Sequence, residues 1–429
     1  MKKKYRIILY TSIFLLCVVA SIILVVKKSN SVYEEESKPK VVKHKSMLSM
    51  NLEQTAGSGD YKTVTQSSWP TEGYKFNAEL SRCENGSTLS WDDTKKAVIV
   101  SGNLSDKCYV YFDIYQPTLA EYIKSQYTGT QGDNALYYHN STLTNGAGDN
   151  SYRYAGANPN NFVCFGSDAS PCPIDNLYRI IGVFGENYHG ANGKQLVKLI
   201  KYDYMTTDEL GTDGDYSQTY KEWGMDSTYK GTYGDGERIG VYYWNYKATG
   251  SATNTWSTSL LNKTNLNTNF INNIGTTWAN KIATVTWKVG GNTWANIGTK
   301  TSSVAYTNEI TNPVTTNTTD NATTYSAKIG LMYVSDYGFA ASPDAWTLTM
   351  SSYNNTTATN NNWMYMGLYE WTISRRADFS NNAFFVGDDG RVSGSHVSYD
   401  YGVRASFNLE SSVSYVSGSG SMSDPIVIN

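Results

Sequence analysis

The longest apolar run of the chain lies close to its N-terminus. Residues 7–26 contain no charged side chain, and basic residues flank the run on both sides. A helix of this length spans the hydrocarbon core of a bilayer, which is about 30 Å thick. The run continues past Ala20 and Ser21 into further aliphatic residues, whereas a cleaved signal peptide has a shorter apolar region and a small-residue exit site. We therefore predict an uncleaved transmembrane anchor over residues 7–26, preceded by a cytoplasmic tail of residues 1–6.

The pattern after the anchor is first polar and then strand-like. Residues 27–60 are rich in Glu, Lys and Ser with little apolar periodicity, which is typical of a flexible stalk. Ala97–Val100 and Tyr109–Ile114 are runs of strand-forming residues separated by turn-forming ones. Residues 61–116 are therefore predicted to form a small β-module, for which hydrophobic burial alone is a marginal source of stability.

Residues 117–429 mix strand and helix patterns. Thr118–Ser125 opens with capping-box spacing and predicts a short helix. Leu177–Phe184 and Gln195–Lys201 are rich in strand formers and flank a loop that contains Gly and Asn, so they predict a hairpin. Apolar residues in Leu260–Ile274 recur at helical spacing. The predicted class is α+β and rich in β-structure.

Two segments of this C-terminal region have low complexity. Thr299–Thr324 and Ser351–Asn362 are rich in Asn and Thr and contain few apolar residues. This composition predicts exposed loops inserted in the domain.

Composition and charge restrict the compartment and the partners. Charged residues are 17% of the chain, aromatic residues are 14%, and 35 residues are Tyr. This balance favours a turn-rich, β-rich extracytoplasmic protein. The formal net charge is −3, and no basic block follows Lys45. Nucleic acid is therefore not expected as a partner.

Cysteine usage points to disulfides outside the membrane. Four of the five cysteines lie beyond the predicted membrane span, and an even number in an exported chain favours disulfide bonds. Three pairings are open, and we favour pairing of nearest neighbours, which closes one loop in each of two successive segments. Zinc is the alternative, but the cysteines lack Cys-x-x-Cys spacing and no His accompanies them. The residues concerned are Cys83, Cys108, Cys164 and Cys172.

The C-terminal region resembles a known fold family. Tyr369–Thr372 and Gly402–Arg404 are similar to the Trp-Glu-Trp-Thr and Gly-Phe-Arg elements of formylglycine-generating-enzyme-like domains, a branch of the C-type lectin fold. An uncharacterised bacterial surface domain is more similar still, with Tyr178–Arg179 in an early strand and Trp256–Leu266 in a helix. The resemblance covers about residues 160–429. It implies a C-type-lectin-like domain.

The same resemblance assigns framework residues. Glu370, Trp371, Gly402 and Arg404 are expected to maintain the fold, and an Arg–carboxylate pair would satisfy polar groups near the core. The chain departs from the family at Ala405, where Pro is usual, and it lacks the Arg-Gly-Gly-Ser-Trp segment of the enzyme-like branch.

Catalysis of the kind found in that branch is not expected. The resemblance implies that sulfatase-activating members need a reactive cysteine pair late in the domain, whereas no cysteine follows Cys172 in this sequence. The iron-dependent members use a histidine set, whereas His44, His139, His189 and His396 are isolated in sequence. We predict no enzyme activity, no cofactor and no metal site.

Acidic residues leave two alternatives open. A glycan hydrolase needs two facing carboxylates, and the available ones are Asp388 with Asp389, or Asp235 with Glu237. Turn formation at Gly387–Gly390 is the favoured interpretation of the first pair. Calcium is the other alternative, with oxygen ligands from Asp213, Asp215, Asp235 and Glu237, although their spacing is not that of a calcium loop.

The candidate binding surface lies between the two framework motifs, over Ser374–Tyr401. Short apolar anchors alternate there with Tyr, Ser, Asn and Arg, side chains that suit adaptable recognition. This segment resembles the variable face of lectin-like proteins that are diversified by retroelements. The predicted ligand-binding residues are Arg376, Asp378, Asn381, Asn382, Asp388, Arg391, His396, Tyr399 and Tyr401.

These observations predict a single-pass protein of the cell membrane with its C-terminal domain outside the cytoplasm. Its expected role is binding, by adhesion to or capture of a glycan or protein ligand. A cell-wall glycan hydrolase and a passive surface-layer component are the alternatives.

Overall fold

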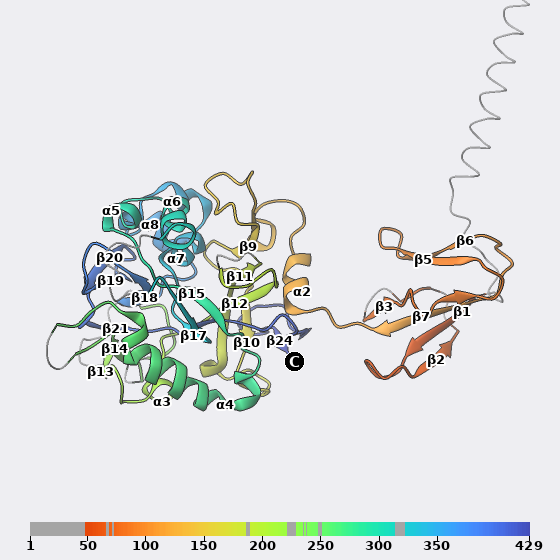
Figure 1. Cartoon of the computed structure of the whole chain (residues 1–429), viewed down its shortest axis with the longest axis horizontal. Helices are drawn as coiled ribbons and strands as arrows, with labels where there is room; N and C mark the ends of the chain where they lie inside the picture. The colour runs from red at the N-terminus through yellow and green to blue at the C-terminus, as the bar shows by residue number, and fades with distance from the viewer. Residues whose placement is uncertain are drawn as a thin grey trace, which may run out of the picture. The chain divides into compact units, whose positions relative to one another are not determined.

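The computed structural model describes residues 48–65, 68–70, 73–185, 189–220, 229–234, 236, 238–247, 251–313 and 322–429. The predicted tail and anchor lie outside this part of the chain. Within it, no helix combines the length and the apolar character needed to cross a bilayer. The chain divides into two compact units at Gln116 and Pro117, and both are rich in β-structure (Figure 1).

The N-terminal unit is built around strand β7 (Cys108–Ile114). Its main sheet has the order β2-β1-β7-β3, and β4 also pairs with β7. The pair β1–β7 is parallel, whereas β2, β3 and β4 pair in antiparallel fashion. A separate hairpin joins β5 and β6. The other strands are β1 (Leu48–Glu53), β2 (Tyr61–Val64), β3 (Tyr74–Phe76), β4 (Arg82–Cys83), β5 (Thr88–Asp92) and β6 (Ala97–Ser101).

The predicted stalk over residues 27–60 is too long, because the folded N-terminal unit already begins at Leu48. Strand β1 lies inside the segment 27–60, and its pairing with β7 runs from Leu48 beside Cys108 to Leu52 beside Phe112. Met50 and Leu52 are buried in the core of the unit with Phe112. The strand was missed because its alternation of apolar and polar residues is only six residues long and stands within a polar segment.

The C-terminal unit contains two large sheets. The first has the order β17-β22-β12-β11-β9-β8, and β10 also pairs with β11. The hairpin of β11 and β12 confirms the prediction from the sequence, and every residue of both strands is buried. The strands are β8 (Leu136–His139), β9 (Ser151–Tyr154), β10 (Phe162–Cys164), β11 (Leu177–Phe184), β12 (Leu196–Lys201), β17 (Ile329–Gly330) and β22 (Ser406–Asn408).

The second sheet has the order β13-β14-β21-β18-β19-β20. Strands β18, β19 and β20 form an antiparallel meander, and β21 joins β18 by a parallel pairing of Glu370 with Gly402. The bounds are β13 (Tyr216–Thr219), β14 (Gly240–Tyr243), β18 (Glu370–Arg375), β19 (Asn382–Val386), β20 (Val392–His396) and β21 (Asp400–Gly402). Two further antiparallel pairs are β15 (Val285–Lys288) with β16 (Thr324–Ala327), and β23 (Tyr415–Ser417) with β24 (Val427–Ile428).

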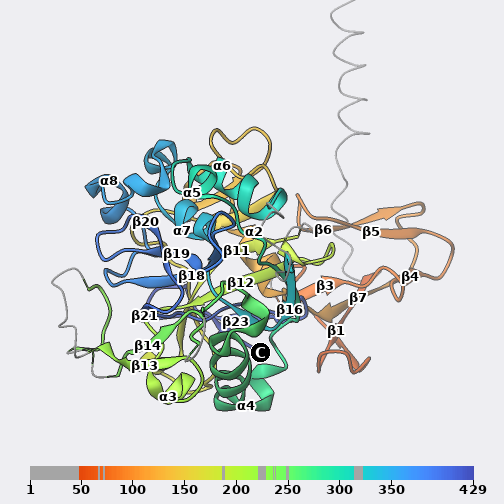
Figure 2. The ribbon, with the colours of Figure 1, turned by 60° about the vertical axis from the view of Figure 1, so that its left-hand side comes forward.

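Short helices cover these sheets. Helices α5, α6, α7 and α8 lie on one side of the unit, and α3 and α4 lie on the opposite side (Figures 1 and 2). Helix α2 begins with the predicted capping box of Thr118 and Glu121, and a helix over Leu261–Phe270 continues into α4. The bounds are α2 (Leu119–Ser125), α3 (Thr207–Leu210), α4 (Ile271–Ala279), α5 (Trp294–Ile297), α6 (Ser302–Tyr306), α7 (Val334–Ala340) and α8 (Thr356–Asn360).

The predicted Asn/Thr-rich loop insertions need correction. The segment 299–324 contains α6 and a following helical turn, Thr307–Thr311, with Tyr306 and Ile310 buried. The segment 351–362 contains α8, whose N-terminus is capped by the side chain of Asn355. Few apolar residues suffice here because the Asn and Thr side chains satisfy backbone groups. Residues 314–321 lie outside the described part.

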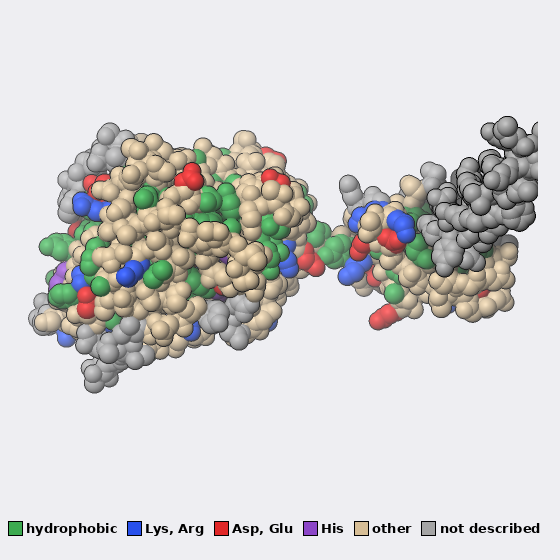
Figure 3. Space-filling view, turned by 90° about the horizontal axis from the view of Figure 1, so that it is seen from above, with side chains coloured by type: hydrophobic (Ala, Val, Ile, Leu, Met, Phe, Trp, Pro, Cys, Tyr) green, Lys and Arg blue, Asp and Glu red, His purple; other side chains and the backbone are tan. Residues whose placement is uncertain are grey.

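Aromatic side chains supply much of the core of the C-terminal unit. Five tryptophans are among its largest fully buried side chains, and buried tyrosines bond to backbone carbonyls, as Tyr204 does to Leu368. The face of this unit seen in Figure 3 carries few charged side chains. The aromatic-rich, charge-poor composition thus reflects both core and surface. The tryptophans are Trp244, Trp256, Trp287, Trp346 and Trp371.

Both predicted disulfides are present. Cys83 bonds to Cys108, its register partner on β7, and Cys164 bonds to Cys172. Pairing of nearest neighbours is therefore confirmed. The cysteines form disulfides in place of the alternative zinc site.

Candidate functional site

The structure divides the predicted ligand-binding residues between two ends of the β19–β20 hairpin. Asn382 on β19 faces His396 on β20 at the open end, whereas Asp388 and Arg391 lie at the turn. Each strand has five residues, which separates the two ends by about 13–17 Å at the usual rise. The nine residues therefore do not form one site.

At the open end, charges are already paired. The guanidinium of Arg376 donates two hydrogen bonds to Asp378, of 3.0 and 2.8 Å, and lies over the exposed ring of Phe379 at 4.4 Å. Asn381 is half-buried, and its backbone carbonyl accepts from Val397. This end is a surface of paired polar groups and one exposed ring.

Tyr399 and Tyr401 have different environments. The ring of Tyr401 packs on Trp371 at 4.5 Å, on Phe385 at 4.9 Å and on Tyr369 at 5.2 Å. Tyr399 is 56% exposed and contacts Tyr401 with a ring separation of 6.4 Å. Tyr401 is therefore mainly a packing residue, whereas Tyr399 is displayed.

At the turn, Arg391 forms an exposed ion pair with Asp389 at 3.0 Å. The backbone carbonyl of Asp388 accepts a hydrogen bond from the hydroxyl of Tyr365. This bond connects the turn to a wall of the pocket described below.

The predicted framework residues do lie together. The carboxylate of Glu370 accepts bonds of 2.8 and 2.9 Å from Arg404, and both side chains are buried. Trp371 is fully buried and donates to the carbonyl of Tyr242. A Cβ atom on Gly402 would lie 2.6 Å from the ring of Tyr204, so this position has no room for a side chain.

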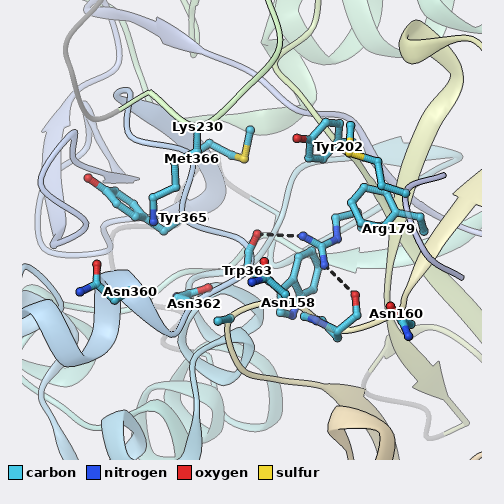
Figure 4. Close-up of a pocket in the computed structure, with 14 residues that line it drawn as sticks. Asn158, Asn160, Arg179, Tyr202, Lys230, Asn360, Asn362, Trp363, Tyr365 and Met366 are labelled. Atoms are coloured by element: carbon cyan, nitrogen blue, oxygen red, sulfur yellow. Dashed lines mark hydrogen bonds between the residues drawn. The ribbon is translucent and has the colours of Figure 1, made fainter.

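The candidate functional site is a pocket of about 490 Å³ in the C-terminal unit. Figure 4 shows Arg179 and Tyr202 on one side of it and Lys230 and Tyr365 on the opposite side. Its volume is within the usual range for small-molecule sites. Aromatic and amide side chains complete the lining, among them Phe162, Trp363, Asn158, Asn160, Asn360 and Asn362.

Arg179 is the most unusual residue of the pocket. It is buried on β11, and its guanidinium lies 4.3 Å from the ring of Phe162 and 4.7 Å from that of Trp363. Nε donates to the side chain of Asn161 at 2.7 Å, and the terminal nitrogens donate to the carbonyls of Pro159 and Trp363. Burial lowers the pKa of Arg179 to about 9, and the charge of Arg404 contributes in the same direction.

The framework pair also braces the pocket. Besides binding Glu370, the guanidinium of Arg404 donates to the carbonyl of Met364 at 2.6 Å and to that of Tyr202 at 3.5 Å. Tyr202 lines the pocket, and Met364 lies between the lining residues Trp363 and Tyr365. The buried ion pair thus fixes two walls at once.

Lys230 supplies a second positive charge. Its ammonium group lies 4.5 Å from the ring of Tyr365 and donates to the carbonyl of Thr359 at 2.9 Å. Burial lowers its pKa. Among the described residues that line the pocket, none is Asp or Glu.

One weak signal for this pocket is present in the sequence. Tyr178–Arg179 stands out there only as part of a strand motif, and the Asn-rich segment before Trp363 predicts a loop. An Arg within an otherwise apolar strand is a buried charge, and buried charges require a partner or a function. The remaining walls come from distant parts of the chain.

The acidic residues considered for hydrolysis or calcium binding are engaged or outside the described part. Asp215 is buried and accepts backbone bonds from Leu261 and Tyr246. Asp213 accepts from the side chain of Asn269. Asp235 and Glu237 lie outside the described residues. Among the described residues, no group of three or more metal-ligating side chains occurs.

Two histidines that are isolated in sequence are buried, and one of them, His189, belongs to a hydrogen-bond network. His189 bonds to the carboxylate of Asp149 at 3.0 Å, and Asp149 also accepts from Arg153 at 2.7 Å and from Tyr306 at 2.9 Å. His139 is fully buried, and its Nδ1 accepts from the backbone of Ala147. His44 lies outside the described residues. The network is enclosed in the core and does not line the pocket.

Comparison with protein-family models, with curated proteins and with solved structures finds no match for the chain.

Proposed function

We propose that the chain is a single-pass surface protein whose C-terminal unit, with a C-type-lectin-like fold, binds a carbohydrate ligand without catalysis. The observation that carries this proposal is the lining of the pocket. Aromatic rings bind the apolar faces of sugar rings, and amides exchange hydrogen bonds with hydroxyl groups. Tyr202 and Trp363 supply rings, and Asn158 and Asn360 supply amides.

Placement outside the cytoplasm is supported by two independent features. The apolar run over residues 7–26 has the length of a membrane span. The structure contains the disulfides Cys83–Cys108 and Cys164–Cys172, and disulfide bonds form and persist in oxidising compartments outside the cytoplasm. Protease treatment of intact cells should remove the C-terminal unit, and protection from protease would contradict the proposed topology.

Binding is favoured over hydrolysis by the chemistry of the pocket. Glycoside hydrolysis uses two carboxyl groups about 5–10 Å apart. The described residues of the lining supply cations and amides in their place.

The test is a glycan and cell-wall polysaccharide array, probed with the detergent-solubilised full chain and with its Tyr202→Ala variant, because Tyr202 lines the pocket and is only partly buried. Retention that depends on Tyr202 and releases no fragments supports the proposal. Release of fragments would establish a hydrolase. Absence of binding to every glycan would overturn carbohydrate binding and leave a protein ligand or a passive surface role.

A further inference from the structure

We infer that the pocket binds an anionic saccharide, with Arg179 contacting the carboxylate or phosphate group of the sugar and Lys230 reinforcing the attraction. This inference rests on the proposed carbohydrate-binding function and specifies the class of its ligand.

The first argument is the missing counterion of Arg179. Two other buried arginines of the same unit have acidic partners: Arg153 binds Asp149 and Arg404 binds Glu370. Within the described part of the chain, Arg179 forms no ion pair and bonds only to neutral oxygens. Burial of a charge is costly unless an opposite charge compensates it. An anionic group of a ligand in the pocket would supply such a charge.

Arg375 provides a useful comparison. It is also buried and, over the described residues, has no acidic partner, but it does not line the pocket. Arg179 therefore differs from Arg375 because it lines the pocket, where a ligand could reach it.

The second argument is that Arg179 is held in a fixed orientation. Its guanidinium lies between the rings of Phe162 and Trp363, and three of its five N–H groups have acceptors in the protein. Its pKa of about 9 keeps it protonated at neutral pH. A planar donor that is already oriented loses little entropy when it binds an oxyanion.

The third argument is the balance of charge in the lining. Arg179 and Lys230 are on opposite sides of the pocket, and the described lining residues include no carboxylate (Figure 4). Two positive charges in a partly enclosed space attract a negatively charged ligand and disfavour a cationic one. The aromatic and amide groups between them suit the ring and hydroxyl groups of the sugar.

The experiment measures binding of the detergent-solubilised full chain by calorimetry. The probes are tetragalacturonate, its fully methyl-esterified form and polyglycerol phosphate. The ester retains the rings and removes the charge, and polyglycerol phosphate retains a phosphate charge without the ring. We expect the acid to bind at least tenfold more tightly than the ester.

The variants separate recognition from folding. Arg179→Gln should reduce the ratio of acid to ester affinity towards one, and Arg179→Lys should restore part of it. Lys230→Gln changes an exposed residue and should lower acid affinity severalfold with unchanged thermal unfolding. Arg391→Gln is the matched control, because it removes an exposed charge away from the lining and should leave affinity unchanged.

Each outcome decides the inference. Equal affinity for acid and ester, or an unchanged ratio in both the Arg179→Gln and Lys230→Gln variants, would overturn it. Failure of both anionic probes to bind at millimolar concentration would also overturn it. If the protein still binds neutral glycans on the array, the proposed carbohydrate-binding function stands without this inference. If it binds no glycan on the array, both the proposed function and this inference are overturned. Tighter binding of polyglycerol phosphate than of tetragalacturonate would show that the charge is recognised without a sugar ring, and it would overturn the inference that the ligand is a saccharide.

Discussion

Arg404 and Glu370 form a buried ion pair with two hydrogen bonds, and the same guanidinium binds the backbone of two segments that carry pocket residues. The pair joins β18 to the segment after β21, and both side chains are buried. The ion pair therefore stabilises the fold, and it also sets the spacing of the pocket walls.

Removal of one member of this pair should be strongly destabilising. Glu370→Gln leaves the charge of Arg404 buried without its partner, which typically costs about 3–5 kcal/mol in the free energy of unfolding. Urea unfolding followed by tryptophan fluorescence measures this cost. Asp389→Asn is the control, since its exposed pair with Arg391 contributes about 0–1 kcal/mol. Equal effects of the two substitutions would show that the buried pair has no special role.

Tyr399 and Tyr401 should respond differently to truncation. Tyr401→Ala removes a ring packed on Trp371 and Phe385 and should cost about 2–3 kcal/mol. Tyr399→Ala removes a displayed ring and should change stability by about 0.5 kcal/mol or less. Thermal unfolding of both single variants tests this. A similar loss of stability in both would mean that Tyr399 belongs to the core.

The elements predicted correctly are those whose signal is local. The capping box of Thr118 and Glu121 involves residues three positions apart, and the hairpin of β11 and β12 follows from two runs of strand formers around a turn. Burial on both faces explains why those runs are continuous and do not alternate. Neighbouring cysteines likewise give the disulfide pairing.

The pocket could not be predicted because its walls are brought together by tertiary structure. Arg179 and the carbonyl of Trp363 that it binds are 184 residues apart. The same reason applies to β1, whose parallel partner β7 lies about sixty residues away, and to the hairpin ends that separate Asn382 from Asp388. These residues are close in sequence and are therefore predicted to form one site, but the strands between them place them at opposite ends of the β19–β20 hairpin.

The disulfide between Cys83 and Cys108 should stabilise the N-terminal unit selectively. The core of that unit is small and includes Val110 and Phe112, and the disulfide closes a loop with a sequence separation of 25. Replacement of both cysteines by Ala should cost about 2–4 kcal/mol. Hydrogen exchange should show faster opening of β1 and β7 with unchanged β11 and β12.

The second disulfide supplies the matched control. Cys164 and Cys172 are separated by 8 positions, and their double Ala variant should lose less stability because the closed loop is shorter. Equal protection of β7 with and without the Cys83–Cys108 bond would contradict the prediction.

His139 should make the stability of the C-terminal unit depend on pH. Complete burial, together with the nearby charge of Arg153, lowers its pKa well below the usual value, against the opposing effect of Asp149. The native state then binds fewer protons than the unfolded state below about pH 6.5, so acidification favours unfolding. Each such histidine contributes a loss of about 1.4 kcal/mol per pH unit until the native pKa is reached.

The variant His139→Gln isolates this contribution, because other buried groups titrate as well, His189 with the same sign and Glu309 with the opposite sign. Burial raises the pKa of Glu309, so its protonation favours the native state as the pH falls. Glutamine cannot titrate and keeps an acceptor for the backbone N–H of Ala147. The difference in free energy of unfolding between wild type and His139→Gln should therefore become less favourable to the wild type as the pH falls from 7 to 5. Urea unfolding in steps of about half a pH unit measures this difference. Parallel pH profiles for wild type and variant would mean that His139 does not stay neutral in the native state.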